Sequence, residues 1–349
     1  MSQRVRWQVQ FTGHETGNFL GYGTANKEIR DALFRAGYEH DENAKVAVHF
    51  CFPLIYEPQP QHTNVLFTMY ENPYDERGLE EVFANAFRRA DVIVTPSEFC
   101  REMFQKLTDK PVHLCPLGID PQSFPYRQRQ WDGRSPFVWL FCGAANRRKF
   151  TVLDEVWNEL FAPGKELNGR AVLYMKTTGL VFNDECKAIM GDAYQTFSPP
   201  EGDVVVGDGI IMDNRKLPHA RMRDVYWGAH GSIFLHCGEG WGMTGLEAMA
   251  TGLPLVVSDY AGTKEYANVD NSFLVPTKWT EIKVRARGME EPDDYKGPWP
   301  DADIAQHQIG QVMRDYAAAS EVARTGAEDA RAFSWDAAGR RLAEIISGL

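Results

Sequence analysis

The chain lacks the cysteine patterns typical of a zinc site or a redox pair. Its 349 residues include six cysteines, scattered at positions 51, 100, 115, 142, 186 and 237, with no Cys-x-x-Cys and no paired His/Cys spacing. Three of them, Cys51, Cys115 and Cys142, lie in apolar stretches typical of strands. We therefore expect reduced, buried thiols and no zinc site.

Long apolar runs and an excess of positive charge are missing too. No stretch reaches the length of a membrane span, and the first residues, MSQRVRWQVQF, lack the apolar core of a signal peptide. These absences predict a cytoplasmic protein without a strong membrane signal. The formal net charge of -11 argues against a general polyanion binder, so we give nucleic acid a low rank among partners, but it does not exclude a local basic pocket.

What the chain does contain is an alternation of short apolar runs with segments long enough for helices. Because many of the runs are apolar without interruption, they are typical of strands covered on both faces of a parallel sheet. The pattern predicts an α/β protein with doubly wound sheets. The expected strands cover residues 4–11, 45–52, 64–70, 91–97, 111–117, 137–143, 171–177, 203–209, 232–238, 253–259 and 272–277, and the expected helices include 77–90, 97–107, 149–161 and 218–228.

A break without apolar periodicity, GIDPQSFPYRQRQWDGRSP, covers residues 118–136 and divides the chain into two Rossmann-like domains. We place the first domain at 1–125, the linker at 126–136 and the second domain at 137–333, with an amphipathic helix, 334–349, packing back on the first. Ligands of such sheets bind outside the carboxyl ends of the strands, which predicts a site in a central cleft faced by both domains.

The stretch GEGWGMTGLEAMATGLP, residues 238–254, combines glycines, acids and a predicted helix start. Alternating glycines let a backbone approach a ligand closely and offer N–H donors, and a helix N-terminus favours phosphate. A carboxylate such as Glu239 would repel a phosphate, but it accepts hydrogen bonds from sugar hydroxyls. A sugar nucleotide carries both groups, so it is the predicted ligand.

The second acid of this stretch, Glu247, has two possible roles. Thr244 and Glu247 have the spacing of a capping box, with threonine as the N-cap and glutamate three residues later. The alternative is a ligand contact. The sequence alone does not separate the two.

With these residues in place, the sequence resembles the retaining glycosyltransferases of family 4, the "group 1" enzymes, which have the GT-B fold and an E-x7-E motif formed here by Glu239 and Glu247. Further similarity lies in RADVIVTPSEFCREMF, PLGID, CGAANRRKF and FSWDAAGRRL, which begin at residues 89, 116, 142 and 333. The resemblance therefore covers most of the chain, and it implies two Rossmann-like domains and glycosyl transfer from a nucleotide sugar.

The resemblance implies roles for individual residues. Glu239 would lie by the donor sugar, Glu247 would bind the ribose, and the diphosphate would be neutralised by Arg148 and Lys149, with Arg147 as an alternative to Arg148. Many members carry an arginine directly after the strand's glycine, where this chain has Ala144. The remaining implied donor contacts are the loop residues Gly240, Trp241, Gly242, Met243 and Thr244, together with Gly23 and Ile210.

On the acceptor side, TMYENPYDE places Tyr70 and Glu71 after a strand, where family members carry acceptor contacts. Gly21 and Gly23 precede a predicted helix but form GxGxxN, so the dinucleotide fingerprint is incomplete. The loop 207–214, which contains Ile210, would supply backbone contacts to the base. Lys176 ends a predicted strand and would either touch phosphate or extend to the surface.

No facing pair of carboxylates of the hydrolase kind is evident, so front-face substitution from a UDP- or GDP-sugar fits best, without a metal or cofactor. The one Asp-x-Asp, Asp301 and Asp303, is predicted to cap a helix. The acceptor stays open between a glycan, a small molecule, a protein and a modified nucleobase. Alternatives are a nicotinamide oxidoreductase, for which Asp41 is near the required distance, a non-catalytic sugar-nucleotide binder, and a phosphorylase or epimerase of the same fold.

Overall fold

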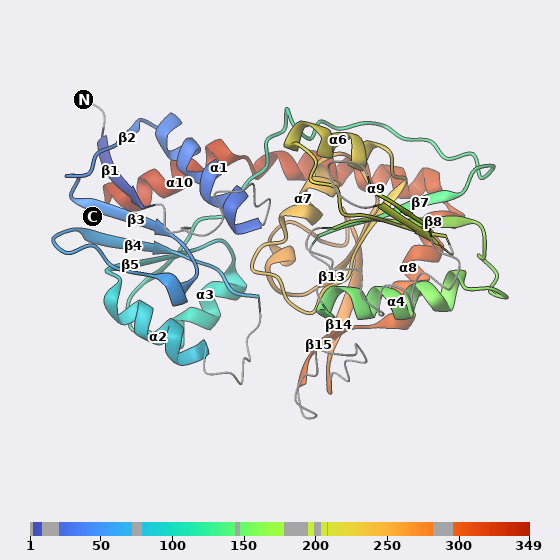
Figure 1. The fold of residues 1–349 in the computed structure, drawn as a ribbon, viewed down its shortest axis with the longest axis horizontal. Helices are drawn as coiled ribbons and strands as arrows, with labels where there is room; N and C mark the ends of the chain where they lie inside the picture. Colours follow the sequence, from blue (N-terminus) through green and yellow to red (C-terminus); the bar gives the residue numbers. More distant parts are fainter. Residues whose placement is uncertain are drawn as a thin grey trace. The chain divides into compact units, whose positions relative to one another are not determined.

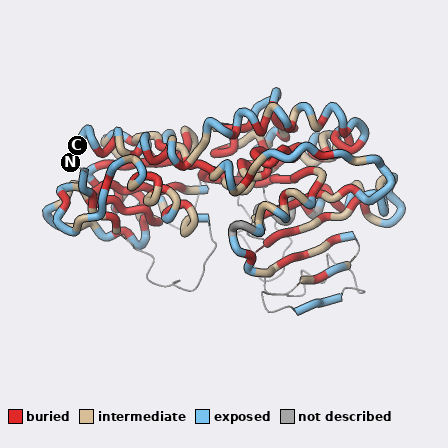
Figure 2. The backbone as a smooth tube through the Cα atoms, turned by 90° about the horizontal axis from the view of Figure 1, so that it is seen from above, coloured by how far each residue is buried: buried red, intermediate tan, exposed pale blue. Residues whose placement is uncertain are grey.

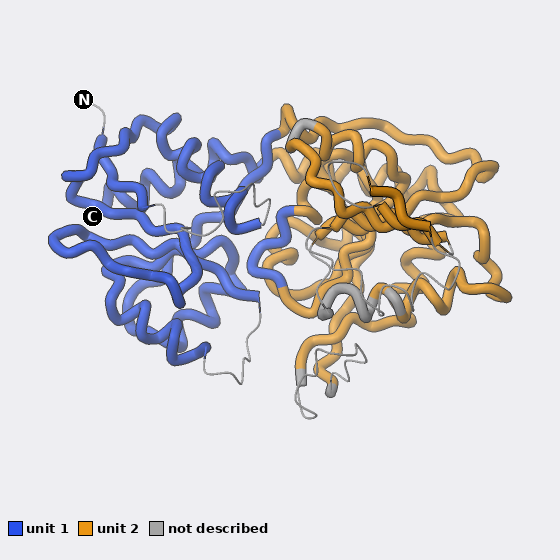
Figure 3. The backbone as a smooth tube through the Cα atoms, in the orientation of Figure 1, with its two compact units in different colours: residues 1–120, 239–243, 332–349 blue, residues 121–238, 244–331 orange. Residues whose placement is uncertain are grey.

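The computed structural model describes residues 3–8, 21–71, 79–143, 147–177, 195–198, 204–207, 209–281 and 296–349. The chain forms two compact units, coloured separately in Figure 3. Unit 1 comprises Met1–Asp120, Glu239–Met243 and Ala332–Leu349, and unit 2 comprises Pro121–Gly238 and Thr244–Arg331. The predicted linker 126–136 lies in unit 2, and the predicted domain boundaries stay predictions.

Unit 1 is built on a six-stranded sheet whose pairings are all parallel, in the order β2-β1-β3-β4-β5-β6. Its central strands are almost wholly buried, as expected when helices cover both faces (Figure 2). The predicted parallel, doubly wound architecture is therefore confirmed for this unit. The strands are β1 (Gln3–Gln8), β2 (Tyr38–His40), β3 (Val46–Phe50), β4 (Thr63–Phe67), β5 (Val92–Thr95) and β6 (Val112–Leu114).

The last helix of the chain packs against the first one (Figure 1). A Cβ on Gly339 would lie 2.5 Å from the backbone of Ala32, so the glycine permits the close approach. Tyr38 donates its hydroxyl hydrogen to the carbonyl of Ala343, at 3.3 Å. The helices of unit 1 are α1 (Gly21–Arg35), the 3-10 helix η1 (Pro53–Ile55), α2 (Leu79–Arg89), α3 (Glu98–Gln105) and α10 (Trp335–Ser347).

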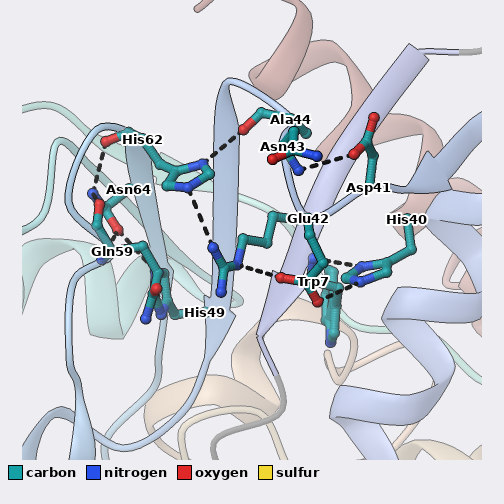
Figure 4. Close-up of polar contacts among 11 residues, drawn as sticks. Trp7, His40, Asp41, Glu42, Asn43, Ala44, His49, Gln59, His62 and Asn64 are labelled. Atoms are coloured by element: carbon teal, nitrogen blue, oxygen red, sulfur yellow. Dashed lines mark hydrogen bonds and ion pairs between the residues drawn. The ribbon is translucent and has the colours of Figure 1, made fainter.

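A polar network connects the first strands of unit 1 (Figure 4). The Nδ1 atom of His40 accepts from the backbone N–H of Trp7 at 3.2 Å, and Asn64 lies 2.9 Å from Nε2 of the fully buried His49. Burial lowers the pKa of His49 to about 4, so its ring is neutral at physiological pH. These contacts pair the backbone N–H of Trp7 and one ring nitrogen of His49, and they are structural.

Unit 2 contains a nine-stranded sheet in the order β15-β14-β13-β12-β7-β8-β11-β10-β9. Its six central strands are parallel, whereas β15 and the pair β10 and β9 join antiparallel at the two edges. The strands are β7 (Phe137–Cys142), β8 (Ala171–Lys176), β9 (Gln195–Phe197), β10 (Val204–Gly207), β11 (Ile210–Asp213), β12 (Gly231–Phe234), β13 (Leu255–Asp259), β14 (Phe273–Glu281) and β15 (Lys296–Pro300).

The prediction of a loop over 207–214 is wrong. Strands β10 and β11 pair antiparallel, Gly207 is paired with Ile210, and Gly209 has a φ of +75°. Glycine at a positive φ between two apolar runs is typical of a tight hairpin, and that signal was overlooked. The side chain of Ile210 belongs to the core of unit 2, so any donor contact there would fall to its backbone.

Helices in unit 2 surround this sheet and closely follow the predicted segments. α4 begins two residues before the predicted start at 149, and α6 covers most of 218–228. The elements are α4 (Arg147–Phe161), α6 (His219–Trp227), α7 (Met243–Ala250), η2 (Ala261–Glu265), α8 (Ala302–Arg314), α9 (Tyr316–Asp329) and η3 (Ala330–Ala332), where α7 starts with the last residue of unit 1.

Arg129 secures the segment that leads into unit 2. Its guanidinium is 9% exposed and donates to the carbonyls of Thr251 at 2.6 Å and Tyr226 at 3.1 Å. Both carbonyls lie at helix C-termini, α7 and α6, where the macrodipole favours a cation. The buried guanidinium of Arg129 therefore anchors the segment that precedes β7, which has no apolar periodicity.

Candidate functional site

The glycine-rich loop Glu239–Met243 belongs to unit 1, although the chain on both sides of it belongs to unit 2. Ser97 donates its hydroxyl hydrogen to the carbonyl of Gly240 at 2.7 Å. A Cβ on Gly240 would lie 2.9 Å from the Cβ of Met69. Since Met69 follows β4 and Ser97 follows β5, the loop packs at the carboxyl ends of these strands, where parallel sheets bind ligands.

The glycines of this loop have a reason that the sequence analysis missed. Gly240 makes room for Met69, and Gly242 has a φ of +87°, a region that favours glycine. Close packing against Met69 thus explains the glycine at 240, and the backbone conformation explains the glycine at 242. Approach to a ligand is not the only reason for either glycine.

Two large side chains of the loop are buried. Glu239 is 8% exposed and Trp241 is 1% exposed. The indole of Trp241 meets the ring of Phe333 edge-on, with centroids 5.6 Å apart. A donor contact by Trp241 would therefore come from its backbone.

Gly21 and Gly23 lie inside the first turn of α1, so the prediction that they precede the helix is wrong. A Cβ on Gly21 would lie 3.5 Å from Cε of Met243. Tyr22, between them, donates to the carbonyl of Met69 at 2.5 Å and accepts from its N–H at 2.9 Å. The start of α1 therefore packs beside the glycine-rich loop. Residues 9–20, which precede it, lie outside the described residues.

The structure brings Tyr70 to the same place. Its carbonyl would lie 3.3 Å from a Cβ on Gly240 and accepts from the thiol of Cys100 at 3.3 Å. Its half-buried ring packs on Phe83, with centroids 4.9 Å apart. Glu71 is exposed. Both predicted acceptor residues thus follow the carboxyl end of β4, where the Glu239 loop also packs.

In unit 2, Glu247 accepts a hydrogen bond from the hydroxyl of Tyr226 at 2.6 Å. The capping-box interpretation is wrong, because α7 begins at Met243 and Thr244 already lies in its first turn. Burial raises the pKa of Glu247 to about 7, and the hydrogen bond from Tyr226 opposes that rise. This carboxyl group is therefore poised near neutral pH.

Three strand ends meet in register in the same unit. Cys142, Lys176 and Asp213 are paired neighbours at the carboxyl ends of β7, β8 and β11. Lys176 is 4% exposed, and its ammonium donates to the carbonyls of Asp213 at 3.1 Å, Arg215 at 2.6 Å and Thr177 at 3.3 Å. It neither extends to the surface nor keeps a donor for phosphate, because carbonyls take all three of its N–H groups.

Asp213 is a second buried charge at this edge. Its carboxylate accepts from the guanidinium of Arg215 at 2.9 Å and from the hydroxyl of Tyr174. Burial by itself would raise the pKa of Asp213, but these hydrogen bonds bring that pKa below its ordinary value. The group is structural and stays ionised.

The predicted diphosphate ligands open a helix. Arg147, Arg148 and Lys149 are the first residues of α4, where positive charge opposes the macrodipole. Their side chains, and Ala144, lie outside the described residues. Asp301 is the N-cap of α8 and accepts from the N–H of Ile304 at 3.2 Å, which confirms the helix-cap interpretation of the Asp-x-Asp.

Sequence reasoning did not find Ser97 or Tyr226. Ser97 stands in the PSEF motif directly before a helix, which is a capping signal and says nothing of Gly240. Tyr226 and Glu247 are far apart in the sequence, and neither residue type at these positions predicts the other. Both contacts are non-local.

Glu247 makes the stability of the protein depend on pH. Its carboxyl has a pKa of about 7 in the folded state against an ordinary value of 4.5, so between these values the folded state binds more protons. We therefore expect the free energy of unfolding to fall by about 2 kcal/mol between about pH 5 and pH 8, relative to Glu247→Gln, which cannot titrate. Urea unfolding at both pH values measures this difference.

Glu80→Gln, on the exposed side of α2, is the matched control and should keep the wild-type pH dependence. An equal difference between wild type and Glu247→Gln at both pH values would contradict the raised pKa.

Within the described ranges, no helix is long and apolar enough to cross a membrane. The same residues contain no group of three or more His, Cys, Asp or Glu side chains placed to hold a metal ion.

Comparisons with known proteins agree with this architecture. Residues 218–342 match the family model "Family 4 Glycosyltransferase in conflict systems". No curated protein sequence matches the chain.

Several solved structures have similar folds. Sucrose-phosphate synthase from Thermosynechococcus elongatus is 14% identical, with a TM-score of 0.69 over 100% of this chain and 99% of that one. HepE from Anabaena, solved in complex with UDP and glucose, is 10% identical, with a TM-score of 0.69 over the whole of both chains. An α,α-trehalose-phosphate synthase (UDP-forming) from Burkholderia vietnamiensis is 11% identical, with a TM-score of 0.59 over 83% of this chain and 68% of that one.

Proposed function

We propose that this chain, whose residues 218–342 match a family 4 glycosyltransferase model and whose fold is similar to that of solved glycosyltransferases, moves a sugar from a nucleotide diphosphate, UDP or GDP, to an acceptor hydroxyl with retention of configuration. The observation that carries the proposal is the glycine-rich loop, which presents the buried Glu239 at the carboxyl ends of β4 and β5. The matched family segment also contains Glu247, held by Tyr226.

In this proposal each unit has its own task. Glu247 of unit 2 binds the ribose hydroxyls, because a carboxylate accepts from both of them and Tyr226 fixes its rotamer. Arg148 and Lys149 at the start of α4 neutralise the diphosphate. Lys176 has no part, since its donors are used by carbonyls.

Glu239 lies by the donor sugar, and the backbone of Gly240, Trp241, Gly242, Met243 and Thr244 meets sugar hydroxyls and phosphate. Tyr70 and Glu71 contact the acceptor, and Gly23 approaches the diphosphate from the start of α1. The backbone of Ile210 remains the predicted contact to the base.

Retention by front-face substitution needs the leaving diphosphate and the attacking hydroxyl on one face of the sugar. The diphosphate oxygen takes the proton of the acceptor hydroxyl, the glycosidic bond to the diphosphate breaks, and the new glycosidic bond forms on the same face. Arg148, Lys149 and the N-terminus of α7 stabilise the developing negative charge, so the step requires neither a metal nor a cofactor. The buried Glu239 supports the positive charge that develops on the sugar ring.

A thermal-shift screen of UDP-, GDP- and ADP-sugars tests the donor part of the proposal. A ligand at 100 times its Kd adds about 2.7 kcal/mol, so one of these donors should raise the melting temperature by several degrees. UDP-glucose is the first probe, because HepE is also solved in complex with it. Lys149→Ala should lose most of this shift.

Lys165→Ala is the matched control for that variant, because the exposed Lys165 pairs with Glu159, at 2.7 Å, on the surface of unit 2. A protein that no sugar nucleotide stabilises would contradict the proposal.

Three further assays distinguish a transferase from the alternative functions. Hydrolysis of the bound donor, measured as released nucleotide diphosphate, would exclude a non-catalytic binder. Energy transfer from tryptophan to NADH on titration would instead favour a nicotinamide oxidoreductase. Product analysis with and without phosphate distinguishes a phosphorylase or epimerase from a transferase.

A further inference from the structure

Ser97 holds two structures together with one hydroxyl group. The side chain is fully buried, directly after β5. Its oxygen accepts from the N–H of Cys100 at 3.3 Å, which caps α3, and its hydrogen goes to the carbonyl of Gly240 at 2.7 Å. The hydroxyl thus uses its donor on the loop and its acceptor on the helix.

The carbonyl of Gly240 is fixed from several sides. The thiol of Cys100 lies 3.8 Å from it, and Met69 and the carbonyl of Tyr70 leave no space for even a Cβ on this residue. A displacement of the loop would therefore break a buried hydrogen bond and lose tight packing together.

We call the contacts of Ser97, Cys100 and Met69 with Gly240 the clamp. The clamp restricts a loop that is flexible by sequence. Glycines alternate with other residues from 238 to 242, and glycine has the largest backbone freedom of any residue. Glu239 is flanked by two of them. An additional backbone anchor limits the movement of the loop that carries this side chain, and a misplacement of about 1 Å can cost about 100-fold in rate.

We propose that Ser97 is a positioning residue, which sets Glu239 relative to the acceptor segment at Tyr70 by holding the carbonyl of Gly240. It acts through the loop and does not touch the substrate. The inference rests on the proposed function for the role of Glu239, whereas the clamp itself is a property of unit 1 that can be measured without any substrate.

Three substitutions distinguish the clamp from a simple helix cap. Ser97→Ala removes both hydrogen bonds. Ser334→Ala removes only a cap of the same chemistry, because Ser334 accepts from the N–H of Ala337 at 3.2 Å at the start of α10. Ser97→Thr keeps a hydroxyl that can donate and accept.

Hydrogen exchange measured by mass spectrometry tests directly whether the clamp restricts the backbone of the loop. We expect the amides of 239–243 to exchange at least about tenfold faster in Ser97→Ala than in the wild type, and at the wild-type rate in Ser334→Ala. Equal exchange of this loop in all three proteins would overturn the clamp, whether or not the enzyme assay works.

Steady-state hydrolysis of UDP-glucose, or of whichever sugar nucleotide the thermal-shift screen selects, measures the effect of the clamp on catalysis. Ser97→Ala should lower kcat about tenfold and leave the donor KM within about twofold, because the residues assigned to the ribose and the basic residues assigned to the diphosphate are unchanged. Ser97→Thr should recover most of the loss, and Ser334→Ala should keep the wild-type kcat.

Equal kcat values in Ser97→Ala and Ser334→Ala, together with an active wild type, would overturn the positioning role alone. A wild type that turns over no sugar nucleotide would refute the proposed function, and the exchange measurement would still decide on the clamp.

Discussion

Replacing Glu239 by glutamine should lower kcat for donor turnover by about 100- to 1,000-fold. The carboxylate is 8% exposed, so its charge acts in a low-dielectric setting on the sugar that becomes positive in the transition state. Glutamine has nearly the same shape and lacks the charge. The donor KM should change little, since ribose and diphosphate are assigned to other residues.

Release of nucleotide diphosphate from UDP-glucose, or from the donor that the screen selects, measures this effect. Glu80→Gln in the same unit removes a charge from the exposed side of α2 and should leave kcat unchanged. A Glu239→Gln protein with kcat within about threefold of the wild type would show that the charge has no part in the reaction.

Replacing Gly118 by alanine should have the largest effect on stability, about 3 kcal/mol or more, seen as a fall of at least about 5 °C in melting temperature. Gly118 lies in the PLGID motif next to Ile119, whose N–H donates to the carbonyl of Phe333 at 2.9 Å. A Cβ on Gly118 would lie 2.3 Å from backbone atoms of both Ser334 and Trp335. Backbone cannot move aside as a flexible side chain would, so α10 must shift.

Differential scanning fluorimetry of Gly118→Ala, with near-UV circular dichroism to confirm the native state, measures the loss. Gly348→Ala is the control, because the nearest atom to its Cβ is a carbonyl oxygen at 3.6 Å, an ordinary contact. A fall of less than about 1 °C for Gly118→Ala would mean that the crossing segment adjusts without cost.

Much of the fold could be predicted because the relevant signals are local. Continuous apolar runs predicted most of the parallel strands, and helices such as α3 and α4 start within two residues of the expected positions. The capping role of Asp301 was also visible, since a cap depends on residues three positions apart. The hairpin of β10 and β11 differs from the predicted strand followed by a loop, because Ile210–Asp213 is a short strand that directly follows the turn.

The candidate site was predictable only in part. The sequence marked Glu239, Glu247 and the glycines of the loop, because a glycine-rich loop before a helix start suits a ligand with phosphate and hydroxyl groups. Tyr70 was predicted from the family resemblance. Glu247 had two predicted roles, and the helix start at Met243 removed one of them. The roles assigned to Arg148 and Lys149 rest on the sequence alone.

By itself, the sequence determined which residue types stand at the ends of strands and which family they resemble. Only the tertiary structure decided that Glu239 and Glu247, eight positions apart, belong to different compact units. It also decided that Ser97 holds Gly240 and that Tyr226 holds Glu247. The physical reason is that periodicity and capping act within a few residues, whereas a buried hydrogen bond between distant residues exists only after the strands that carry them have paired.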